Sequence, residues 1–331
     1  MTADEILFLT PQDVRRLVTM PECIVAVEEA FRLHGEGKAV PPVVAALHSG
    51  NGGFHIKAGM LSGSRTYFAA KVNGNFPNNP VRLGLPTIQG LIILCDAENG
   101  IPLAVMDSRE ITSLRTAAAT AIAAKHLARP ESDTLTICGC GNQGRFQLAG
   151  LAHIFTLRTV FAFDQNDAQV SRFVSTAKSD LGISVIPARD LKAALRQSDI
   201  CVTCTPSHQP ILDADDVRPG TFVAAVGADS PSKQELTAKL MGKGRVVCDV
   251  VEQCMVMGDL HHAIEAGVLS QSNVCAELGE IVAGKKPGRQ SQEEIMIFDS
   301  TGMALQDVAA AALAYEKARQ LGIGTPLQLA A

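Results

Sequence analysis

Residues 134–144 decide the fold of this chain, and they read Thr-Leu-Thr-Ile-Cys-Gly-Cys-Gly-Asn-Gln-Gly. An apolar, strand-like run leads into the pattern Gly-x-Gly-x-x-Gly, and helix-like sequence follows it. In a dinucleotide-binding turn the first glycine, here Gly139, permits the tight turn from strand to helix, and the second, Gly141, lets backbone amides approach a pyrophosphate. The third, Gly144, lets helix and strand pack closely. The stretch therefore predicts a βαβ unit that binds a dinucleotide.

An acidic residue, Asp164, follows the next apolar run, 159–163, and lies twenty positions after the last glycine. A carboxylate at this place accepts hydrogen bonds from the adenosine ribose hydroxyls, and its charge repels a 2′-phosphate. The pyrophosphate is expected at the positive end of the helix that opens near Asn142. The alternative is a chance glycine cluster in an ordinary βα turn, which the strand context and the spaced acid disfavour. We therefore predict NAD(H), rather than NADP(H), as the cofactor.

The composition excludes several classes of protein. A chain of 331 residues is too long for one compact core and indicates two lobes, and its 47% hydrophobic and 19% charged residues are typical of a well-buried globular protein. A net charge of −5 does not attract nucleic acid or an anionic membrane, since both are negatively charged. The first residues show no basic segment followed by an apolar one, so no signal peptide is expected. We expect a cytoplasmic protein that binds neither nucleic acid nor membrane.

The cysteines do not form a metal-binding pattern. Nine cysteines in such a chain are expected to be reduced and buried. Cys201 and Cys204 form a CxxC pair, but no second pair lies at zinc spacing. Both cysteines fall in a strand-like run, where positions three apart face opposite sides of a sheet. We therefore predict no metal site.

The first 130 residues do not alternate between strand and helix. Thr10 followed by Pro11 predicts the start of a helix, and a second helix is expected after Pro21. Strand-like runs follow at 53–60, 66–73, 87–95 and 101–106, and the last two flank an Asn99-Gly100 turn. This pattern indicates a mostly antiparallel sheet. A long alanine-rich helix is expected over 110–128, and its small side chains allow another element to pack very close to it.

From residue 133 strand-like and helix-like segments alternate along the sequence. This is the doubly wound pattern of a Rossmann-type parallel sheet. The strands are continuously apolar, as a sheet covered on both faces requires, and are expected at 134–138, 159–163, 184–186, 200–203, 222–226 and 245–249. A strand-like run at 295–298 and a helix at 303–318 are expected to return to the first lobe. We therefore predict an α/β fold in which 131–294 form the Rossmann-type domain. Residues 1–130, completed by 295–331, form a discontinuous α+β domain.

Ligands of open α/β sheets bind at the carboxyl ends of the strands, so residues that follow strands are candidates for chemistry. Asp229 follows one strand, and Thr205-Pro206-Ser207 follows another. Asp229 is therefore expected on the nicotinamide side of the cleft, and the alternative is a cap for a helix at 235–241. His261 and His262 fall in helix-like sequence without an acid or serine pattern, and we interpret them as structural.

Two basic residues in apolar surroundings are further candidates. Lys71 lies within an apolar strand, where a charged lysine needs a partner or a function. Burial beside a cation lowers the pKa of a lysine towards the range that is useful for proton transfer. Arg115 lies in an uncharged helical stretch and is suited to hold a carboxylate through two parallel hydrogen bonds. The alternatives are an edge-strand lysine in water and a structural arginine.

At these residues the chain closely resembles the ornithine cyclodeaminase/mu-crystallin family. The resemblance spans nearly the whole chain, in the family's order, and is much less specific for the substrate than for the family. It implies a homodimer joined through the first domain, NAD(P) bound in the second, and chemistry at the α-carbon of a small amino or imino acid. The matching blocks are Lys71-Val-Asn-Gly-Asn-Phe-Pro-Asn-Asn-Pro80, Gly84-Leu-Pro-Thr87, Pro102-Leu-Ala-Val-Met-Asp107, Leu114-Arg-Thr-Ala-Ala-Ala119, Gly139 to Gly144, Val226-Gly-Ala-Asp229, Lys233-Gln-Glu-Leu236, Ala276-Glu-Leu-Gly-Glu280, Ser300-Thr-Gly-Met303 and Gln306-Asp307.

The resemblance also implies roles for individual residues. Lys71 and Arg115 would hold the substrate carboxylate, and Lys71 would also move a proton. Asp229 would sit beside the reacting nitrogen or activate water. The expected cofactor-binding residues are Gly139, Gly141, Asn142, Gln143, Gly144, Asp164, Thr205, Pro206, Ser207, Gly227, Ser300 and Gly302.

One departure from the family concerns the substrate. Cyclodeaminases carry an additional carboxylate-binding arginine in the region that here reads Val43-Val-Ala-Ala46, and a glutamate near His55-Ile-Lys57. This chain has no arginine from residue 33 to residue 64 and no acid from 37 to 95, so a bound ornithine would lack a local acid for its distal ammonium. Lys57 and His55 add positive charge instead, which suits a second anion or a replaced carboxylate contact. Both are therefore candidate substrate-binding residues.

The sequence predicts an NAD(H)-dependent reductase or dehydrogenase that acts on the C–N bond of a small imino or amino acid, of the ketimine reductase or amino-acid dehydrogenase type. Hydride would pass between the nicotinamide and the α-carbon, with Arg115 fixing the carboxylate and Lys71 or Asp229 handling the proton. The first alternative is ornithine cyclodeaminase, which makes proline and ammonia from ornithine with catalytic NAD. The second is a non-catalytic, mu-crystallin-like dinucleotide-binding protein, and the joint presence of Lys71, Arg115 and Asp229 argues against it.

Overall fold

The computed structural model describes residues 5–63 and 65–328. Two compact units divide the chain: the first contains the residues up to Arg115 and those from Met303 onward, and the second runs from Thr116 to Gly302. The first unit is therefore discontinuous. Its first boundary falls within the helix α4 (Ser108–Leu127), earlier than the boundary expected after residue 130.

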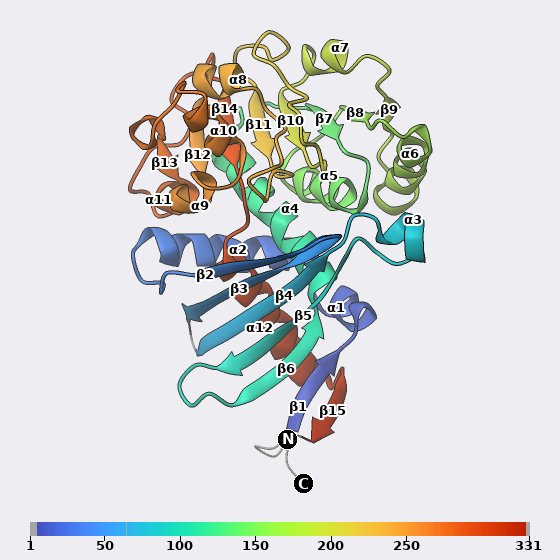
Figure 1. Ribbon diagram of the computed structural model, residues 1–331, viewed down its shortest axis with the longest axis vertical. Coiled ribbons are helices and arrows are strands. Elements are labelled where there is room, and N and C mark those ends of the chain that lie inside the picture. Colours follow the sequence, from blue (N-terminus) through green and yellow to red (C-terminus); the bar gives the residue numbers. More distant parts are fainter. Residues whose placement is uncertain (1–4, 64, 329–331) are drawn as a thin grey trace. The chain divides into compact units, whose positions relative to one another are not determined.

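The first unit contains a seven-stranded sheet in the order β15-β1-β6-β5-β4-β3-β2 (Figure 1). β1 and β6 are parallel and the other neighbouring pairs are antiparallel, so the mostly antiparallel sheet that the sequence predicts is confirmed. The four predicted strands correspond to β3, β4, β5 and β6, and the remaining three are additional to the prediction. The strands are β1 (Glu5–Leu9), β2 (Val43–Ser49), β3 (Gly52–Ser62), β4 (Thr66–Asn75), β5 (Ile88–Asp96), β6 (Pro102–Asp107) and β15 (Thr325–Gln328).

Among its described residues, this unit has four further helices: α1 (Pro11–Leu17), α2 (Met20–Gly35), α3 (Asn79–Leu83) and α12 (Ala304–Leu321). Thr10 caps α1 as predicted, because its hydroxyl accepts a hydrogen bond from the amide of Asp13 at 3.2 Å. The long helix α12 lies across one face of the sheet (Figure 1). Its side chains pack over Gly59 of β3, where a Cβ would come within 3.1 Å of Leu305. This glycine therefore lets helix and sheet approach closely.

The opposite face of the same sheet is apolar and exposed. The strand register places Val72 beside Leu91, Leu47 beside Phe54, and Ile93 two residues beyond Leu91 on β5. Since side chains two residues apart in a strand share a face, these five lie on one surface. Val72 is 41% exposed and Leu47 63%, and the other three lie between these values. A continuous apolar face of this kind marks an interaction surface.

The second unit contains an eight-stranded parallel sheet in the order β13-β12-β14-β11-β10-β7-β8-β9. From β7 the chain builds β8 and β9 on one side and β10 and β11 on the other, so the carboxyl edge of β7 is the topological switch point of the sheet. The predicted doubly wound, Rossmann-type fold is confirmed. The strands are β7 (Thr134–Cys138), β8 (Thr159–Phe163), β9 (Ile186–Pro187), β10 (Ile200–Thr203), β11 (Phe222–Ala225), β12 (Arg245–Cys248), β13 (Ala276–Glu277) and β14 (Met296–Asp299).

Short helices connect most of these strands, and some of their bounds differ from the prediction. The strand predicted at 184–186 is the two-residue β9, and the helix predicted at 235–241 begins only at Ala238, where the hydroxyl of Thr237 caps it. The alternative role of Asp229 as the cap of this helix is therefore wrong. The helices are α5 (Asn142–Ile154), α6 (Asp167–Leu181), α7 (Leu191–Leu195), α8 (Ala238–Lys243), α9 (Val251–Cys254), α10 (Asp259–Glu265) and α11 (Leu278–Val282), with a 3₁₀ helix at Gln271–Asn273.

One expectation about the last part of the chain is wrong. The run 295–298 was expected to return to the first lobe, but β14 pairs with β11 and β12 inside the parallel sheet. Every residue of β14 is buried, and the interior of a parallel sheet is the environment that such a continuously apolar run suits. The chain rejoins the first unit only from Met303 onward.

The composition of the helices determines how they pack. A Cβ placed on Gly150 of α5 would lie 3.0 Å from the carbonyl oxygen of Ala117 in α4. Both helices therefore need small side chains where they cross. The alanine-rich sequence of α4 predicts such close packing.

Within residues 5–63 and 65–328, no helix is both long enough and apolar enough to span a bilayer.

Candidate functional site

The residues predicted to hold a cofactor lie at the carboxyl ends of neighbouring strands in the second unit. Gly139 follows β7, Asp164 follows β8, and Thr205 follows β10. Gly227 lies just beyond β11, and Ser300 follows β14. These strands are consecutive in the sheet order β14-β11-β10-β7-β8, so the fold brings all five ends to one edge, next to the switch point.

The glycine turn has the geometry that a bound pyrophosphate requires. Gly139 has a φ of 103°, which other residues rarely adopt, and a Cβ there would lie 2.8 Å from the carbonyl oxygen of Cys204. A Cβ on Gly144 would lie 2.2 Å from the carbonyl oxygen of Gly139, whereas a Cβ on Gly141 would meet nothing within 4 Å. Gly141 is also the N-cap of α5, and no side chain caps that helix end. Open space at the positive end of an uncapped helix fits a dinucleotide phosphate.

Asp164 supports this turn from the neighbouring strand. Its Oδ2 accepts a hydrogen bond from the amide of Cys140 at 2.8 Å, and its Oδ1 accepts one from the amide of Asn166 at 2.9 Å. The carboxylate therefore holds the glycine turn in place. Each carboxylate oxygen can accept a further bond, so these contacts leave capacity for hydroxyl donors.

A buried glutamate that the sequence analysis does not single out joins the ends of β10 and β11. The Glu235 side chain is completely buried. Its Oε1 accepts from the amide and the hydroxyl of Thr205, at 2.6 and 2.7 Å, and its Oε2 accepts from the hydroxyl of Thr203 and the amide of Gly227, at 2.7 and 2.8 Å. Burial raises the pKa of Glu235, although these hydrogen bonds oppose the rise. Glu235 therefore fixes the positions of Thr205 and Gly227, two of the predicted cofactor contacts.

A second buried acid plays a similar part at the end of β14. The Oδ2 of Asp249 accepts from the hydroxyl of Ser300 at 3.1 Å and from the amide of Gly302 at 2.6 Å. The hydroxyl of Thr301 donates to the other oxygen at 3.3 Å. The predicted cofactor contacts Ser300 and Gly302 thus have these donors directed into the protein, which fixes the conformation of the loop that they form.

Asp229 lies in the loop after β11 and is paired with a lysine. Its Oδ1 lies 2.6 Å from the Nζ of Lys233, and its side chain is 45% exposed. The amide of Asp229 donates to the carbonyl oxygen of Gly227 at 3.1 Å, so the turn places the carboxylate directly after the strand end. The carboxylate is therefore accessible, as a group that contacts a substrate must be.

The first unit contains a buried ionic cluster around Asp307 of α12. The Nζ of Lys71 lies 2.7 Å from Oδ2 of Asp307, and the Nε of Arg115 lies 2.9 Å from Oδ1. The Nη1 of Arg115 donates to Oε1 of Gln306 at 2.9 Å. Lys71 is only 3% exposed and β4 lies inside the sheet, so the alternative of an edge-strand lysine in water is wrong. Asp307 is an acid in an apolar helix, which is the same kind of sequence signal that identifies Lys71, but from the sequence it is predicted only as part of the family block Gln306-Asp307.

The electrostatics of this cluster favour an additional anion. Burial and the nearby charge of Arg115 lower the pKa of Lys71 from 10.5 to about 7. Burial alone would raise the pKa of Asp307, but Arg115 and Lys71 outweigh it and lower that pKa. Lys57 also contributes to both shifts, because it lies directly opposite Lys71 in the β3–β4 register. The buried carboxylate of Asp307 thus lies among the basic side chains of Lys57, Lys71 and Arg115.

The two remaining candidates, Lys57 and His55, lie on the same face of β3. Lys57 is buried and pairs with Val44 of β2, and half-buried His55 pairs with Ala46. The segment 43–46, where cyclodeaminases carry an arginine, is therefore the strand next to these two residues. Basic side chains of β3 thus pair with β2, the strand in which the resemblance to cyclodeaminases implies an arginine.

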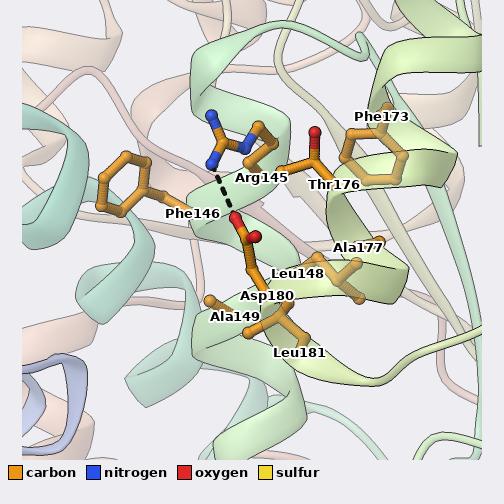
Figure 2. Close-up of a pocket in the computed structure, with 9 residues that line it drawn as sticks. All are labelled: Arg145, Phe146, Leu148, Ala149, Phe173, Thr176, Ala177, Asp180 and Leu181. Carbon is orange, nitrogen blue, oxygen red and sulfur yellow. Dashed lines mark hydrogen bonds and ion pairs between the residues drawn. The ribbon is translucent and has the colours of Figure 1, made fainter.

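Helices α5 and α6 enclose a small pocket that we do not assign to the cofactor (Figure 2). Its volume is about 120 Å³, and it is lined mainly by apolar side chains such as Phe146, Leu148 and Phe173. Arg145 and Asp180 at the pocket pair with each other at 3.0 Å. Ligand sites usually measure about 300–1,000 Å³ and offer convergent polar groups, so this hollow is a packing feature.

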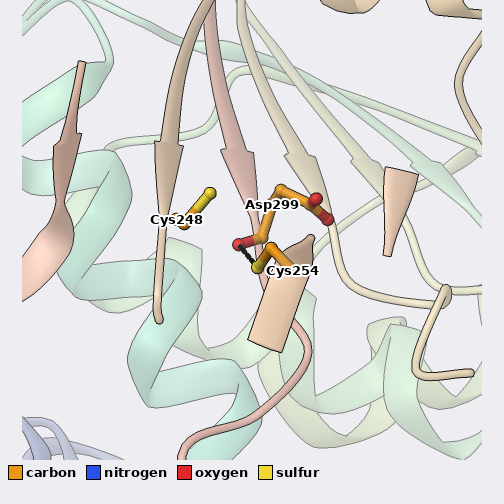
Figure 3. A group of neighbouring side chains, drawn as sticks. All are labelled: Cys248, Cys254 and Asp299. Carbon is orange, nitrogen blue, oxygen red and sulfur yellow. Dashed lines mark hydrogen bonds between the residues drawn. The ribbon is translucent and has the colours of Figure 1, made fainter. Parts of the chain in front are cut away.

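Cys248, Cys254 and Asp299 meet at the ends of β12 and β14, and all three are completely buried (Figure 3). The Sγ of Cys254 donates to the backbone carbonyl of Asp299 at 3.4 Å. The carboxylate of Asp299 accepts from the amides of Asp259 and Leu260 at 3.3 and 2.8 Å. Burial raises the pKa of the Cys254 thiol well above 9, which disfavours the thiolate that a metal needs. These groups hold the strand ends together through hydrogen bonds.

Comparison with known proteins identifies the family. The model of the ornithine cyclodeaminase/mu-crystallin family matches residues 4–322. The chain belongs to this family. The resemblance noted in the sequence is thereby confirmed, and it covers both units.

Family members with named activities are similar over nearly their whole length. The alanine dehydrogenase of Archaeoglobus fulgidus is 43% identical over 326 residues, which are 98% of either chain. A solved structure of an archaeal alanine dehydrogenase dimer with bound NAD has a TM-score of 0.94 at 42% identity, and the match covers 98% of this chain and 100% of that one. The Δ1-pyrroline-2-carboxylate reductase of Thermococcus litoralis, solved with NADH and L-proline, has a TM-score of 0.91 at 32% identity, with 97% and 99% covered.

The role of Glu235 leads to a testable prediction. In the variant Glu235→Gln, one acceptor becomes an NH₂ group that faces buried donors, at a cost of about 1–3 kcal/mol. We expect the Kd for NADH, measured by fluorescence titration, to rise about tenfold. Glu252→Gln, which changes an exposed glutamate of α9, is the matched control and should bind as the wild type does. A folded Glu235→Gln variant with unchanged NADH affinity would contradict this role.

Proposed function

We propose that this protein is an NAD(H)-dependent oxidoreductase that acts on the C–N bond of a small amino or imino acid, as a dehydrogenase or an imine reductase. The observation that carries the proposal is the buried cluster of Lys71, Arg115 and Asp307, in which a lysine with a pKa of about 7 lies among basic side chains. The cofactor geometry of the second unit and the NAD-linked family members support it.

The basic side chains of the first unit bind the substrate carboxylate. Lys71 and Arg115 both pair with the carboxylate of Asp307, and two buried cations that share one carboxylate favour an additional anion. The carboxylate of an amino acid supplies it, and the planar guanidinium of Arg115 can bind it through parallel hydrogen bonds. Asp307 and Gln306 hold that guanidinium in a fixed orientation. His55 extends the basic face of β3 and adds a further contact for the substrate.

Lys71 carries the proton at the reacting nitrogen. With a pKa of about 7, both its forms are populated near neutral pH. The charged form donates a proton to the nitrogen during imine reduction, and the neutral form accepts one during amine oxidation. Asp307 orients Nζ for this transfer at 2.7 Å. NAD(H), when bound, supplies or accepts the hydride at the α-carbon.

Asp229 is the second group that we assign to the reaction. Its carboxylate is paired with Lys233 and partly exposed. It binds the substrate nitrogen, or the water and ammonia that enter and leave when an imine exchanges with a keto acid. Its Oδ1 accepts from Lys233 at 2.6 Å, and the carboxylate acts as a hydrogen-bond acceptor for the substrate as well.

The second unit is the NAD-binding domain in this proposal, and the first unit is the substrate-binding domain. Gly141, Asn142, Gln143 and Gly144 form the turn and the first helical residues that receive the pyrophosphate. Asp164 accepts from the ribose hydroxyls with the capacity that its two backbone contacts leave. The remaining walls come from the strand-end loops, with Gly139, Thr205, Pro206, Ser207, Gly227, Ser300 and Gly302.

The charge of the side chains on β2 and β3 distinguishes the proposed substrate from ornithine, the substrate of cyclodeamination. Strands β2 and β3 carry Lys57 and His55 but no acid, so they offer no counter-charge to the distal ammonium of ornithine. A small, uncharged side chain suits this environment better. The acidic net charge of −5 likewise favours a small-molecule partner over nucleic acid.

We also propose that two copies of the chain form a homodimer through the exposed apolar face of the first unit. Val72, Leu91 and Ile93 lie on this face together with Leu47 and Phe54. Leaving them in water costs about 25 cal/mol for each Å² of apolar surface. A second copy covers the face with a surface of the same kind, as a two-fold interface requires.

A substrate panel tests the reaction. Purified protein is offered cyclic imino acids, and keto acids with ammonia, while NADH absorbance is followed. We expect oxidation of NADH with a small imino acid, and we expect Lys71→Met to slow turnover by about 10²–10⁴-fold with unchanged NADH affinity. Lys178→Met changes an exposed lysine of α6 and is the matched control.

Two results of this panel would contradict the proposal. Production of proline and ammonia from ornithine without net change in NADH would identify a cyclodeaminase. Tight NADH binding without turnover of any imino acid, or of any keto acid with ammonia, would favour a non-catalytic dinucleotide-binding protein.

The dimer is tested by placing charge on the apolar face. In Leu91→Lys combined with Ile93→Lys, two lysines would have to be desolvated within the interface, so we expect the mass measured by light scattering to fall from two chains to one. Val81→Lys, at a 91% exposed position of α3 outside the sheet, should leave the mass unchanged. A wild-type protein of one chain, or a double variant that keeps the mass of two, would exclude this interface.

A further inference from the structure

Helix α10 brings three potential metal ligands together at the surface of the second unit. The Nε2 of His261 lies 3.5 Å from Oε2 of Glu265, and the Nδ1 of His262 lies 3.9 Å from the same oxygen. The ligand atoms of all three residues lie within 4.8 Å of one another. Glu265 is 63% exposed and the histidines about a fifth, so the group is open to solvent on one side.

The other nitrogen of each histidine is bound to a backbone carbonyl. The Nδ1 of His261 lies 3.2 Å from the carbonyl oxygen of Met255, and the Nε2 of His262 lies 2.9 Å from that of Lys233. Because a carbonyl oxygen can only accept, these two nitrogens carry hydrogen atoms. In the neutral imidazoles, the nitrogens nearest Glu265 are therefore the ones with free lone pairs. Metal-bound histidines show this arrangement, in which a backbone carbonyl fixes the tautomer and the orientation of the ring.

Two imidazole nitrogens and a carboxylate oxygen thus converge on one point at the surface. Each of these atoms can offer a lone pair to a cation that lies between them. We propose that His261, His262 and Glu265 form a binding site for one divalent transition-metal cation of the type that prefers imidazole, such as Zn²⁺, Co²⁺ or Ni²⁺. The remaining coordination positions belong to water.

The distances agree with such a site. Zinc binds imidazole nitrogen and carboxylate oxygen at about 2.0–2.2 Å, so neighbouring ligands of a tetrahedral ion lie about 3.4 Å apart. The separations of 3.5 and 3.9 Å are close to this value before any adjustment of side chains. The site is separate from the groups assigned above, but the carbonyl of Lys233 joins it to the segment that carries Asp229.

Metal titration of the full chain tests the proposal. After treatment with a chelator, the protein is titrated with Co²⁺ while the visible d–d absorption is followed, and with Zn²⁺ by calorimetry. The test variant combines His261→Asn, His262→Gln and Glu265→Gln. The asparagine amide keeps the donor to Met255, and the glutamine amide keeps the donor to Lys233, so the variant loses the ligands and retains the structural hydrogen bonds. His153→Asn, at an exposed position of α5, is the matched control.

We expect one equivalent of Co²⁺ and of Zn²⁺ to bind to the wild type and to the control, and no binding to the triple variant. Two outcomes would overturn the proposal. The first is metal binding by the triple variant with wild-type affinity, which would place the ion elsewhere. The second is a wild type that binds neither Co²⁺ nor Zn²⁺.

Discussion

The proposed chemistry depends on the contact of Lys71 and Arg115 with the carboxylate of Asp307, deep in the first unit. A buried charge is tolerated only with close partners, and removal of one partner from such a group costs about 3–5 kcal/mol. The cluster therefore requires β4, α4 and α12 to meet, although these elements are far apart in the chain. It also keeps a lysine with a lowered pKa and an excess of basic groups in one place. In the proposed reaction the lysine exchanges a proton with the nitrogen of the amino acid, and the basic groups bind its carboxylate.

The second unit uses buried acids for a different purpose. Glu235 joins the ends of β10 and β11, and Asp249 holds the loop after β14. Neither carboxylate contacts a basic side chain through these bonds, since all the partners are amides and hydroxyls. Each acid thus orders a loop without presenting its own charge to solvent. In this arrangement the glycine turn provides the space for the phosphate. The two acids fix the positions of the loops that we expect to line the cofactor site.

The sequence predicts those parts of the fold that depend on local patterns. Strands β7, β8 and β10 have the predicted bounds, because each is an uninterrupted apolar run between turn residues. Lys71 and Arg115 are identifiable because a charge in an apolar stretch needs a partner. The partner itself is not local: Asp307 lies 236 positions from Lys71. The assignment of β14 to the wrong unit has the same origin, since an apolar strand does not reveal which sheet it joins.

The most direct measurement of the central claim is an NMR titration of the lysine Nζ signals, with Lys71 assigned by its absence from the Lys71→Met spectrum. The account predicts that Lys71 titrates at a pH of about 7, charged below this value and neutral above it, because burial and Arg115 oppose its charge. The other assigned lysines serve as internal references in the same spectra. A Lys71 signal that titrates at the ordinary lysine pKa of about 10.4 would contradict the account, since Lys71 could not then exchange a proton near neutral pH.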